Sequence, residues 1–496
     1  MTLPLFVVLP LFAAFINTMV GRFLKLFSEV FVNLINFVVL ILCIIWIYKI
    51  NTLNNNIFVY EVGGWKIPYG VALVADPVSV FMLFTVNLVA FLVGIYSVSY
   101  IEKYTEKWGF YSLFELMLAG MNGVIISGDI FNIFVFLEIA TIASYGLVAF
   151  GTQKEELEAS FKYMVLGSIS TGLILLGIVL IYAYTSTLNL ADIASILILS
   201  EDKLIIRVIM FIFMIGFVIK AAIVPFHWWL PDAHPSAPAP ISAMLSGVLI
   251  KTLGVYLIVR LFFNVFPIDE KILKMICYLG TLSMVVGVIL ALYQWDYKRL
   301  LAYHSISQVG YIFLGIGLAT PMGILGGIFH LFNHSLFKSL LFLTSGALEY
   351  NFGTRNLKEY HNVNRIMPIT TFSATIGSFS IAGIPPFNGF WSKLIIIIAC
   401  LEKRDILLAL IAALVSVLTL ASFLKVLKYA FYTEQKYNTG PKLLKEVPFF
   451  MQFSMLTLAI LCFVSGIILY PNIKHIVFDG VIKFITENLY IKFILK

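Results

Sequence analysis

Long apolar runs alternate with short polar stretches along the whole chain. A helix needs about 20 mostly apolar residues to cross a bilayer. Runs close to or above that length lie at residues 2–20, 28–49, 76–100, 110–127, 130–150, 161–186, 204–232, 239–262, 274–294, 300–319, 321–346, 367–400, 406–430 and 449–470. The pattern therefore predicts an all-α polytopic membrane protein with about 14 transmembrane helices.

No polar linker or charged block divides these runs, so we expect a single transmembrane domain over residues 1–496. The first 20 residues lack a basic leading segment and a clear cleavage site, which favours a first span over a removed signal peptide. The expected parts are three N-terminal helices in 2–100, a first five-helix repeat in 110–262, a second in 274–430, and a last helix with an amphipathic tail in 449–496. Because five is odd, the two repeats would lie inverted in the membrane, as in many transporters.

Two of the runs look interrupted by proline. The prolines concerned are Pro225 and Pro231, shortly after Lys220, and Pro385 and Pro386, shortly before Lys393. Proline removes a helical hydrogen bond and frees carbonyl groups, which a membrane interior tolerates only beside protein or a water-filled cavity. A broken helix beside a charged residue indicates a transport site. A plain proline kink is the alternative.

Charged residues are scarce but include five inside the apolar runs. The chain is 61% hydrophobic and 12% charged, against about 25% charged in soluble proteins. The five intramembrane charges are Glu138, Lys220, Lys251, Lys338 and Lys393. Each costs about 2.5–3.5 kcal/mol at the bilayer centre unless it is paired, neutralised or hydrated. Such residues most often mark an ion or proton pathway.

All four intramembrane cations are lysines and none is an arginine. A desolvated lysine can release its proton near neutral pH, whereas arginine stays protonated. Lys220 is the expected partner of Glu138, as a proton-coupled pair or, alternatively, as a static ion pair that fixes helix packing. Lys251 has no acid in its own helix, which favours a relay over a lysine that reaches an interface.

Histidines extend this pattern. His330, His334 and Lys338 are four residues apart and share one helical face, where protons can move by short hops. A metal site at the two histidines lacks a third ligand, so we expect none. Lys393 would be the last station of the relay or a helix-end counter-charge. His304 would be a relay member or a packing residue.

Other polar residues lie near the ends of the runs. For Asp76, Glu115 and Asp129 we expect capping or interfacial roles. In the tail, charged side chains four residues apart predict an amphipathic helix on the membrane surface or against a neighbouring subunit; these are His475, Asp479, Lys483 and Glu487.

Several function classes are excluded. Cys43, Cys277, Cys400 and Cys462 are dispersed, which indicates neither a disulfide framework nor a metal cluster. No nucleotide loop and no haem or iron–sulfur ligand set is present, so we expect no cofactor and no catalytic or redox centre. The net charge of +7 is a topology signal rather than a nucleic-acid signal, and the loop charges place both termini on the outer side of the cell membrane.

Five motifs together resemble the antiporter-like subunits of respiratory complex I and its relatives. They are FLEIATIASY, WWLPDAHPSAPAPISAMLSG, YKRLLAYHSISQVGY, HSLFKSLLF and GIPPFNGFWSK, in order over roughly residues 110–400. Within that superfamily the chain is most similar to D-type subunits of Mrp multisubunit Na⁺/H⁺ antiporters and to their counterparts in membrane-bound hydrogenase-type complexes. The resemblance implies 14 helices with two inverted repeats.

The resemblance also implies residue roles. Glu138 and Lys220 would form the coupled pair of the first half-channel, and Lys251 the bridge between halves. His334 and Lys338 would form the central relay, followed by Lys393 as the exit lysine.

We therefore expect a proton-translocating subunit of a multi-subunit membrane complex, with other membrane subunits, the lipid bilayer, H⁺ and Na⁺ as partners. One alternative is the pump module of an NADH:quinone oxidoreductase-type or hydrogenase-type redox complex, whose electron carriers lie on other chains. A stand-alone metabolite transporter is a further alternative, against which the row of lysines argues.

Overall fold

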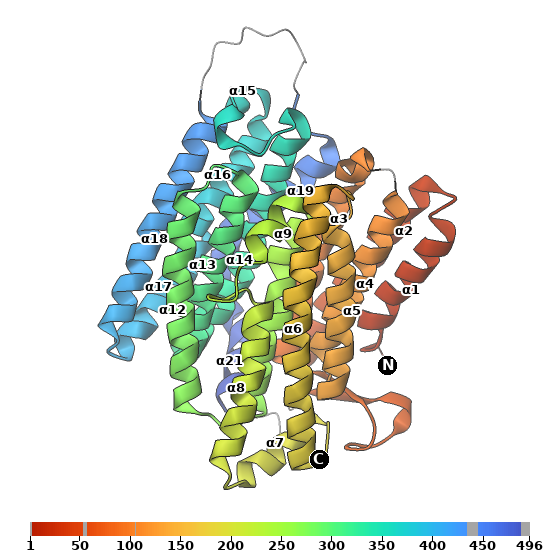
Figure 1. Cartoon of the computed structure of the whole chain (residues 1–496), viewed down its shortest axis with the longest axis vertical. Helices are drawn as coiled ribbons and strands as arrows, with labels where there is room; N and C mark the ends of the chain where they lie inside the picture. The colour runs from red at the N-terminus through yellow and green to blue at the C-terminus, as the bar shows by residue number, and fades with distance from the viewer. Residues whose placement is uncertain (1, 53–56, 105, 434–444, 488–496) are drawn as a thin grey trace.

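A computed structural model describes residues 2–52, 57–104, 106–433 and 445–487. Its long helices run in a common direction and form one bundle, with α15 at one end and α7 at the other (Figure 1). Ten of the described helices are long and apolar enough to cross a membrane. The chain is therefore a helical polytopic membrane protein, as its hydropathy pattern predicts.

The N-terminal part contains the only sheet within the described residues. It runs α1 (Leu5–Val20), α2 (Lys25–Thr52), β1 (Phe58–Glu61), η1 (Val62–Gly64), β2 (Ala72–Ala75), α3 (Pro77–Tyr100) and η2 (Ile101–Lys103). The two strands pair antiparallel, with Phe58 opposite Ala75. The all-α prediction missed this hairpin, because four-residue strands are too short to show a clear period of two.

The next part starts with α4 (Lys107–Ile126), α5 (Ile130–Val148), α6 (Lys154–Thr185), α7 (Leu190–Leu199) and α8 (Lys203–Lys220). It continues with α9 (Leu230–Ser236), α10 (Ala239–Met244), the π-helical segments η3 (Leu245–Leu249) and η4 (Lys251–Tyr256), and α11 (Leu257–Asn264). The short helix α7 was not expected from the sequence.

The remaining elements begin with α12 (Glu270–Leu292), α13 (Tyr297–Gly317), α14 (Pro321–Phe352), η5 (Leu357–Glu359) and α15 (Val363–Ile366). The chain then forms α16 (Pro368–Ala382), α17 (Asn388–Glu402), α18 (Ile406–Val426) and η6 (Leu427–Phe431). The last elements are α19 (Phe449–Val464), η7 (Ser465–Leu469), α20 (Pro471–Lys474), η8 (His475–Asp479) and α21 (Gly480–Thr486).

Three passes form the interior of the bundle. Every residue of Ala239–Asn264 is buried, as are nearly all residues of α13 and those of α14 from Gly323 to Leu348. The outer helices instead expose large apolar side chains such as Phe161 on α6 and Leu414 on α18. In a membrane protein such faces contact lipid or neighbouring subunits, because apolar surface is stable there. Lys251 and Lys338, which lie within these passes, are therefore enclosed by protein.

Three acidic residues were predicted to lie near helix ends. Asp76 caps α3 by accepting hydrogen bonds from the amides of Val78 and Ser79, and Asp129 caps α5; both predictions are confirmed. The prediction for Glu115 is wrong, because this residue lies fully buried in the middle of α4 and accepts a hydrogen bond from Asn36 of α2 at 2.9 Å. Its partner lies far away in the sequence and could not be inferred from it.

The C-terminal tail packs on its own chain. Phe478 contacts the rings of Phe81 on α3 and Phe329 on α14, and the carbonyl of Phe484 accepts a hydrogen bond from Asn264. The expected surface helix thus packs with Phe478 on its own bundle instead of on a neighbouring subunit, and it runs continuously through α20, the π-helical η8 and α21. Residues 488–496 of the predicted tail lie outside the described residues.

Candidate functional site

The first charged residue at an interrupted helix is Lys220, the last residue of α8. The chain between α8 and α9 is non-helical and contains Pro225, while Pro231 lies at the start of α9. The side chain of Lys220 is 4% exposed, and its Nζ donates a hydrogen bond to Thr141 Oγ1 at 3.2 Å. The break thus leaves a buried amine at a helix end.

Glu138 lies one helical turn before Thr141 on α5. Among the described residues no carboxylate oxygen lies within 4.0 Å of Lys220 Nζ, so the expected direct Glu138–Lys220 ion pair is not formed in this structure. The hydroxyl of Thr141 accepts a hydrogen bond from Lys220 instead. Glu138 Oε1 is buried and has no hydrogen-bond partner among the described groups.

Lys251 begins a π-helical segment in the centre of the bundle. Its Nζ donates to the carbonyl oxygens of Gly247, at 2.8 Å, and Ser246. A π-helix adds one residue per turn and is frequent at functional sites. The hydropathy pattern contains no signal for it, because a π-helix and an α-helix differ in their hydrogen bonds and not in their residue types.

Two serines join Lys251 to Lys338. Ser246, whose carbonyl binds Lys251, has its hydroxyl 2.6 Å from the hydroxyl of Ser305 on α13. Ser305 donates to the carbonyl of Leu301 at 3.0 Å, and the same carbonyl accepts Lys338 Nζ at 2.5 Å. Ser246, Ser305 and the Leu301 carbonyl therefore lie between the two lysines, and each makes a hydrogen bond to a lysine or to the next group.

The histidines of α14 form a second group. The ring centroids of His330 and His334 are 6.4 Å apart. His330 Nδ1 lies 2.9 Å from Ser392 Oγ, the residue before Lys393 on α17. Neither ring nitrogen of His334 has a partner within the described part of the chain. The α14 face predicted from the sequence is thus connected to the second broken helix.

Lys393 lies beside that second break, between α16 and α17. Its Nζ donates to the carbonyl of Ile381 at 2.7 Å, lies 3.4 Å from Ser416 Oγ and is 4.9 Å from the ring centroid of Tyr311. The aromatic ring of Tyr311 also contacts His330. Tyr311 therefore links the histidine group to Lys393.

The prolines explain why these carbonyls are available. In a regular helix the carbonyls of Ile381 and Ala382 would accept hydrogen bonds from the amides four residues later, and those residues are Pro385 and Pro386, which have no N–H. Lys393 binds the first carbonyl and Ser416 binds the second at 2.9 Å. The broken helix thus supplies acceptors to a buried amine.

His304 and the remaining histidines complete the site. His304 Nε2 lies 2.8 Å from Ser422 Oγ on α18, one residue from the Ser246–Ser305 connection. His227 and His234, near the first break, are buried and have no hydrogen-bond partner at either ring nitrogen among the described groups. In the part of the chain that the structure describes, no three His, Cys, Asp or Glu side chains are grouped as metal ligands.

Sequence reasoning missed the neutral members of the site. Thr141, Ser246, Ser305, Tyr311 and Ser392 all contact a predicted charged residue or connect two of them. Hydroxyl residues are common in membrane helices, where they usually bond to the carbonyl four residues earlier. A serine that bridges two helices has no distinguishing sequence pattern.

The geometry indicates what the site can do. Buried amines, imidazoles and hydroxyls are held by neutral carbonyls and hydroxyls along a row of helices. Such groups can accept and release protons, whereas the described residues offer no grouped carboxylate and thiolate ligands for a bound metal.

Two family models match. The description "NADH:quinone oxidoreductase/Mrp antiporter, TM" covers residues 127–419, and "NADH-Ubiquinone oxidoreductase (complex I), chain 5 N-terminus" covers residues 60–111. The first match includes all six predicted relay residues and spans more than half of the chain.

Among curated relatives, the D subunit of the Na⁺/H⁺ antiporter of Alkalihalophilus pseudofirmus is 36% identical over 454 residues, which covers 89% of this chain and 91% of the relative. The N subunit of the NADH-quinone oxidoreductase of Desulforudis audaxviator is 33% identical over 379 residues and covers 75% of each. The chain is thus similar to subunits of both kinds.

Two solved structures are also similar. A chain of the Mrp complex from Dietzia sp. DQ12-45-1b superposes with a TM-score of 0.91 at 27% identity, covering 100% of this chain and 99% of that one. A chain of the membrane-bound sulfane sulfur reductase, an archaeal respiratory membrane complex, gives a TM-score of 0.91 at 29% identity and covers 99% of each. By its family-model match, its identity to these relatives and its fold, the chain belongs to the NADH:quinone oxidoreductase/Mrp antiporter transmembrane family.

Proposed function

We propose that this chain is a proton-translocating, antiporter-like subunit of a multi-subunit membrane complex. The proposed relay runs through Glu138, Lys220, Lys251, His334, Lys338 and Lys393, with His330 and His304 as further members. The observation that carries it is the presence of two buried hydrogen-bonded groups, one on η3, η4, α13 and α14 that contains Lys251 and Lys338, and one on α14 and α17 that contains His330. The titratable amines and imidazoles would exchange protons in short transfers, while the main-chain carbonyls only hold them in place.

The proposal extends to the architecture. It counts 14 crossings, with α8–α9 and α16–α17 each taken as one interrupted crossing, and relates α4–α11 to α12–η6 as two inverted five-helix repeats. A lysine at each interruption supports that relation, because transport sites lie beside broken helices in such repeats. Both termini would lie on the outer side of the cell membrane, in keeping with the loop charges.

Two kinds of membrane complex could contain such a subunit. In an Mrp-type antiporter assembly, proton flow would be coupled to Na⁺; in a redox complex, electron transfer on other chains would drive it. The similarity to the Na⁺/H⁺ antiporter relative, at 36% identity over 89% of the chain, favours the first. The similarity to the NADH-quinone oxidoreductase relative supports the redox complex as the second candidate host. Iron–sulfur absorbance in the complex purified from its native membrane would favour the redox host, and its absence the antiporter.

The relay is tested by Lys220→Ala in the assembled complex. We expect proton transport by membrane vesicles to fall at least about tenfold, because the variant lacks the amine at the first break. Lys203→Ala is the matched control, since Lys203 is exposed at the other end of the same helix. Transport by Lys220→Ala at the rate of the control, in equally assembled complex, would refute the proposal.

A further inference from the structure

A second set of polar side chains, here called the polar seam, lies between α2 and α4. Neither helix carries a member of the proposed relay. Neighbouring seam residues on each helix are three or four positions apart, so each set occupies one helical face. The seam consists of Glu29, Asn33 and Asn36 on α2 and of Lys107, Tyr111 and Glu115 on α4.

One end of the polar seam reaches the surface of the protein. Glu29 and Lys107 form an ion pair there, and their side chains are 10% and 23% exposed. Glu102 adds a second carboxylate 3.9 Å from the same amine. Two acids against one base give this end a negative charge, which attracts cations.

Glu115 lies deeper in the polar seam, two turns or about 12 Å along α4 from Lys107. It is fully buried and forms no ion pair within the described residues. Its Oε1 accepts a hydrogen bond from Asn36 at 2.9 Å, while its Oε2 has no hydrogen-bond partner among the described groups. A buried carboxylate is strongly unfavourable unless a positive charge compensates for it.

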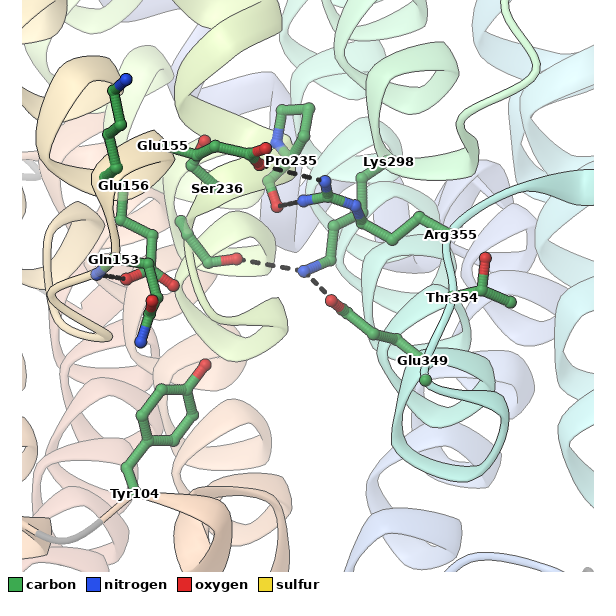
Figure 2. A pocket seen from close by; sticks show the side chains of 13 residues that line it. Tyr104, Gln153, Glu155, Glu156, Pro235, Ser236, Lys298, Glu349, Thr354 and Arg355 are labelled. Atoms are coloured by element: carbon green, nitrogen blue, oxygen red, sulfur yellow. Dashed lines mark hydrogen bonds and ion pairs between the residues drawn. The ribbon is translucent and has the colours of Figure 1, made fainter.

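Two other enclosed carboxylates of this chain have such a charge beside them. Asp76 Oδ2 lies 2.7 Å from a guanidinium nitrogen of Arg260. Figure 2 shows the second case, in which Glu349 lies 2.7 Å from Lys298. Since no side chain of this kind pairs with Glu115 in the described part of the chain, the missing positive charge would come from solution.

Three further oxygen atoms of the polar seam are free. Asn33 Oδ1, Asn36 Oδ1 and the hydroxyl of Tyr111 are buried and have no hydrogen-bond partner among the described groups. The Tyr111 hydroxyl faces Asn33. On α3, a Cβ at Gly94 would lie 2.7 Å from Asn33 Oδ1 and 3.6 Å from Asn36 Nδ2. The glycine therefore leaves space for both amides.

Free oxygens are not general among the buried asparagines of these helices. Asn87 of α3 and Asn122 of α4 exchange hydrogen bonds at 3.0 and 3.2 Å. Their amide groups also donate to the carbonyls of Leu83 and Phe6. This neighbouring pair satisfies its polar atoms within the protein, whereas the polar seam does not.

The free oxygens select a cation by its type and its charge. Carboxylate and amide oxygens suit hard cations, and the polar seam contains no thiol or imidazole of the kind that transition metals prefer. One carboxylate balances one positive charge, so a divalent ion would leave an excess charge in the low-dielectric interior. Half a turn of the Asn36 amide would present its oxygen in place of its nitrogen to a monovalent ion.

We propose that Glu115, Asn36 and Asn33 bind one Na⁺ ion, with the hydroxyl of Tyr111 as a further ligand. The ion would enter from the exposed, acidic end of the polar seam. This inference rests on the proposed function in its antiporter form, because it assigns the coupled cation to residues of this chain. The cation site would thus lie on other helices than the proton relay.

The site is tested by equilibrium binding of radioactive Na⁺ to the complex purified with all its subunits. The test variant is Glu115→Gln, which keeps an oxygen to accept the hydrogen bond from Asn36. We expect it to bind one Na⁺ fewer per complex than wild type, and we expect an equal concentration of Ca²⁺ not to displace that ion from wild type. An equal number of bound ions in the two complexes, or displacement by Ca²⁺, would overturn the site.

Glu106→Gln is the matched control for the loss of a carboxylate. Glu106 directly precedes α4, is exposed and accepts a hydrogen bond from Trp108, which glutamine can also accept. We expect this variant to bind as many Na⁺ ions as wild type. Loss of one ion in both variants would assign the effect to surface charge and overturn the buried site.

Asn33→Ala decides the question if Glu115→Gln does not assemble. The Asn33 amide donates to a carbonyl of its own helix, that of Glu29, at 2.8 Å, so little of the fold depends on it. We expect the Na⁺ affinity to fall at least about fivefold. Asn87→Ala is its control, because Asn87 is a buried asparagine outside the site, and its affinity should be unchanged. Equal affinities of the two variants would contradict the proposed ligand.

A binding measurement also separates this site from the relay. Lys220→Ala should bind Na⁺ as wild type does, although it lacks proton transport. If Glu115→Gln keeps every bound Na⁺ while Lys220→Ala lacks transport, the cation site is wrong and the relay stands. If Lys220→Ala transports normally while Glu115→Gln has lost one ion, the relay fails and the cation site stands.

Discussion

At the scale of single residues, the buried amines depend on acceptors that the backbone provides. Lys251, Lys338 and Lys393 each donate to a main-chain carbonyl. A carbonyl that already serves a helix can accept a second hydrogen bond, and one freed by proline can accept a first. The lysines are thus held without a neighbouring acid.

Pro385→Ala tests this view of Lys393. The substitution restores an N–H that can donate a hydrogen bond to the Ile381 carbonyl. This N–H would compete with the amine of Lys393 for the same oxygen. We expect proton transport to fall several-fold, measured in vesicles at equal assembly. Pro386→Ala is the control, because it affects the Ala382 carbonyl, which Ser416 binds instead. Equal transport by the two variants would contradict the role of Ile381.

Ser305→Ala tests the connection between Lys251 and Lys338. It removes the hydroxyl that touches both Ser246 and the Leu301 carbonyl, and we expect transport to slow about five- to tenfold. The buried Ser307 on the same helix binds Met284 on α12 and serves as control. Each change should lower the free energy of unfolding by only about 0.5–1.5 kcal/mol. Slower transport by the Ser305 variant than by the equally stable Ser307 variant would therefore support a role of Ser305 in the relay. Equal transport rates of the two variants would contradict that role.

The charged members of the site could be predicted from the sequence because a lysine within an apolar run is conspicuous. Ser305, Thr141 and Tyr311 could not, because their importance depends on which helices become neighbours. The Glu138–Lys220 contact was expected from charge alone, whereas in the structure Lys220 donates a hydrogen bond to the hydroxyl of Thr141.

At the scale of elements, close helix packing around η3 holds Lys251 in place. A Cβ on Gly247 would clash with Ser339 of α14. Overpacking of a buried site costs about 1–3 kcal/mol, so we expect Gly247→Ala to lower the melting temperature of the complex. Gly172→Ala on α6 meets nothing within 4 Å and should be neutral or slightly stabilising. A Gly247→Ala variant as stable as this control would contradict the packing argument.

An ion pair at the end of the bundle near α7 links the first turns of two helices. Asp269 caps α12 and binds Arg207 of α8 at 2.8 Å. Burial raises the pKa of Asp269, but the hydrogen bond from Arg207, the amide hydrogen bonds and the Arg207 charge outweigh it, and the net shift is downward.

This pair gives a pH-dependent prediction. A lowered pKa in the folded state stabilises the fold above the ordinary aspartate pKa, and the stabilisation is lost as the pH falls through the folded value. We expect Asp269→Asn to melt lower than wild type at pH 7, with the difference narrowing in acid. A difference that is constant from pH 7 to pH 3 would contradict the assigned interaction.

The long helices were predictable because an apolar run of membrane length has few alternative structures. The β1–β2 hairpin, α7 and the π-helical segments η3 and η4 were not. The first two are shorter than a membrane span, and a π-helix differs from an α-helix in hydrogen bonding rather than in residue type. The tail was predicted as amphipathic, but its docking site on α3 and α14 required the folded bundle.

At the scale of the whole molecule, the polar groups are concentrated in the inner passes and the apolar side chains face outward. Lys220 and Lys393, at the two interrupted helices, are as deeply buried as Lys251 and Lys338 of the inner passes. In the proposed function the proton path would therefore be internal to one chain, and neighbouring subunits would contact its apolar outer faces.

The main-chain acceptors of the buried lysines have one more consequence. A carbonyl has no net charge, and among the described residues no carboxylate lies within ion-pairing distance of Lys251, Lys338 or Lys393. Deprotonation of any of these amines therefore leaves no bare anion behind in the low-dielectric interior. Each of these amines can therefore lose and regain its proton independently of an acidic partner. When one lysine becomes protonated, its positive charge repels that of the next protonated lysine and favours the release of a proton from it.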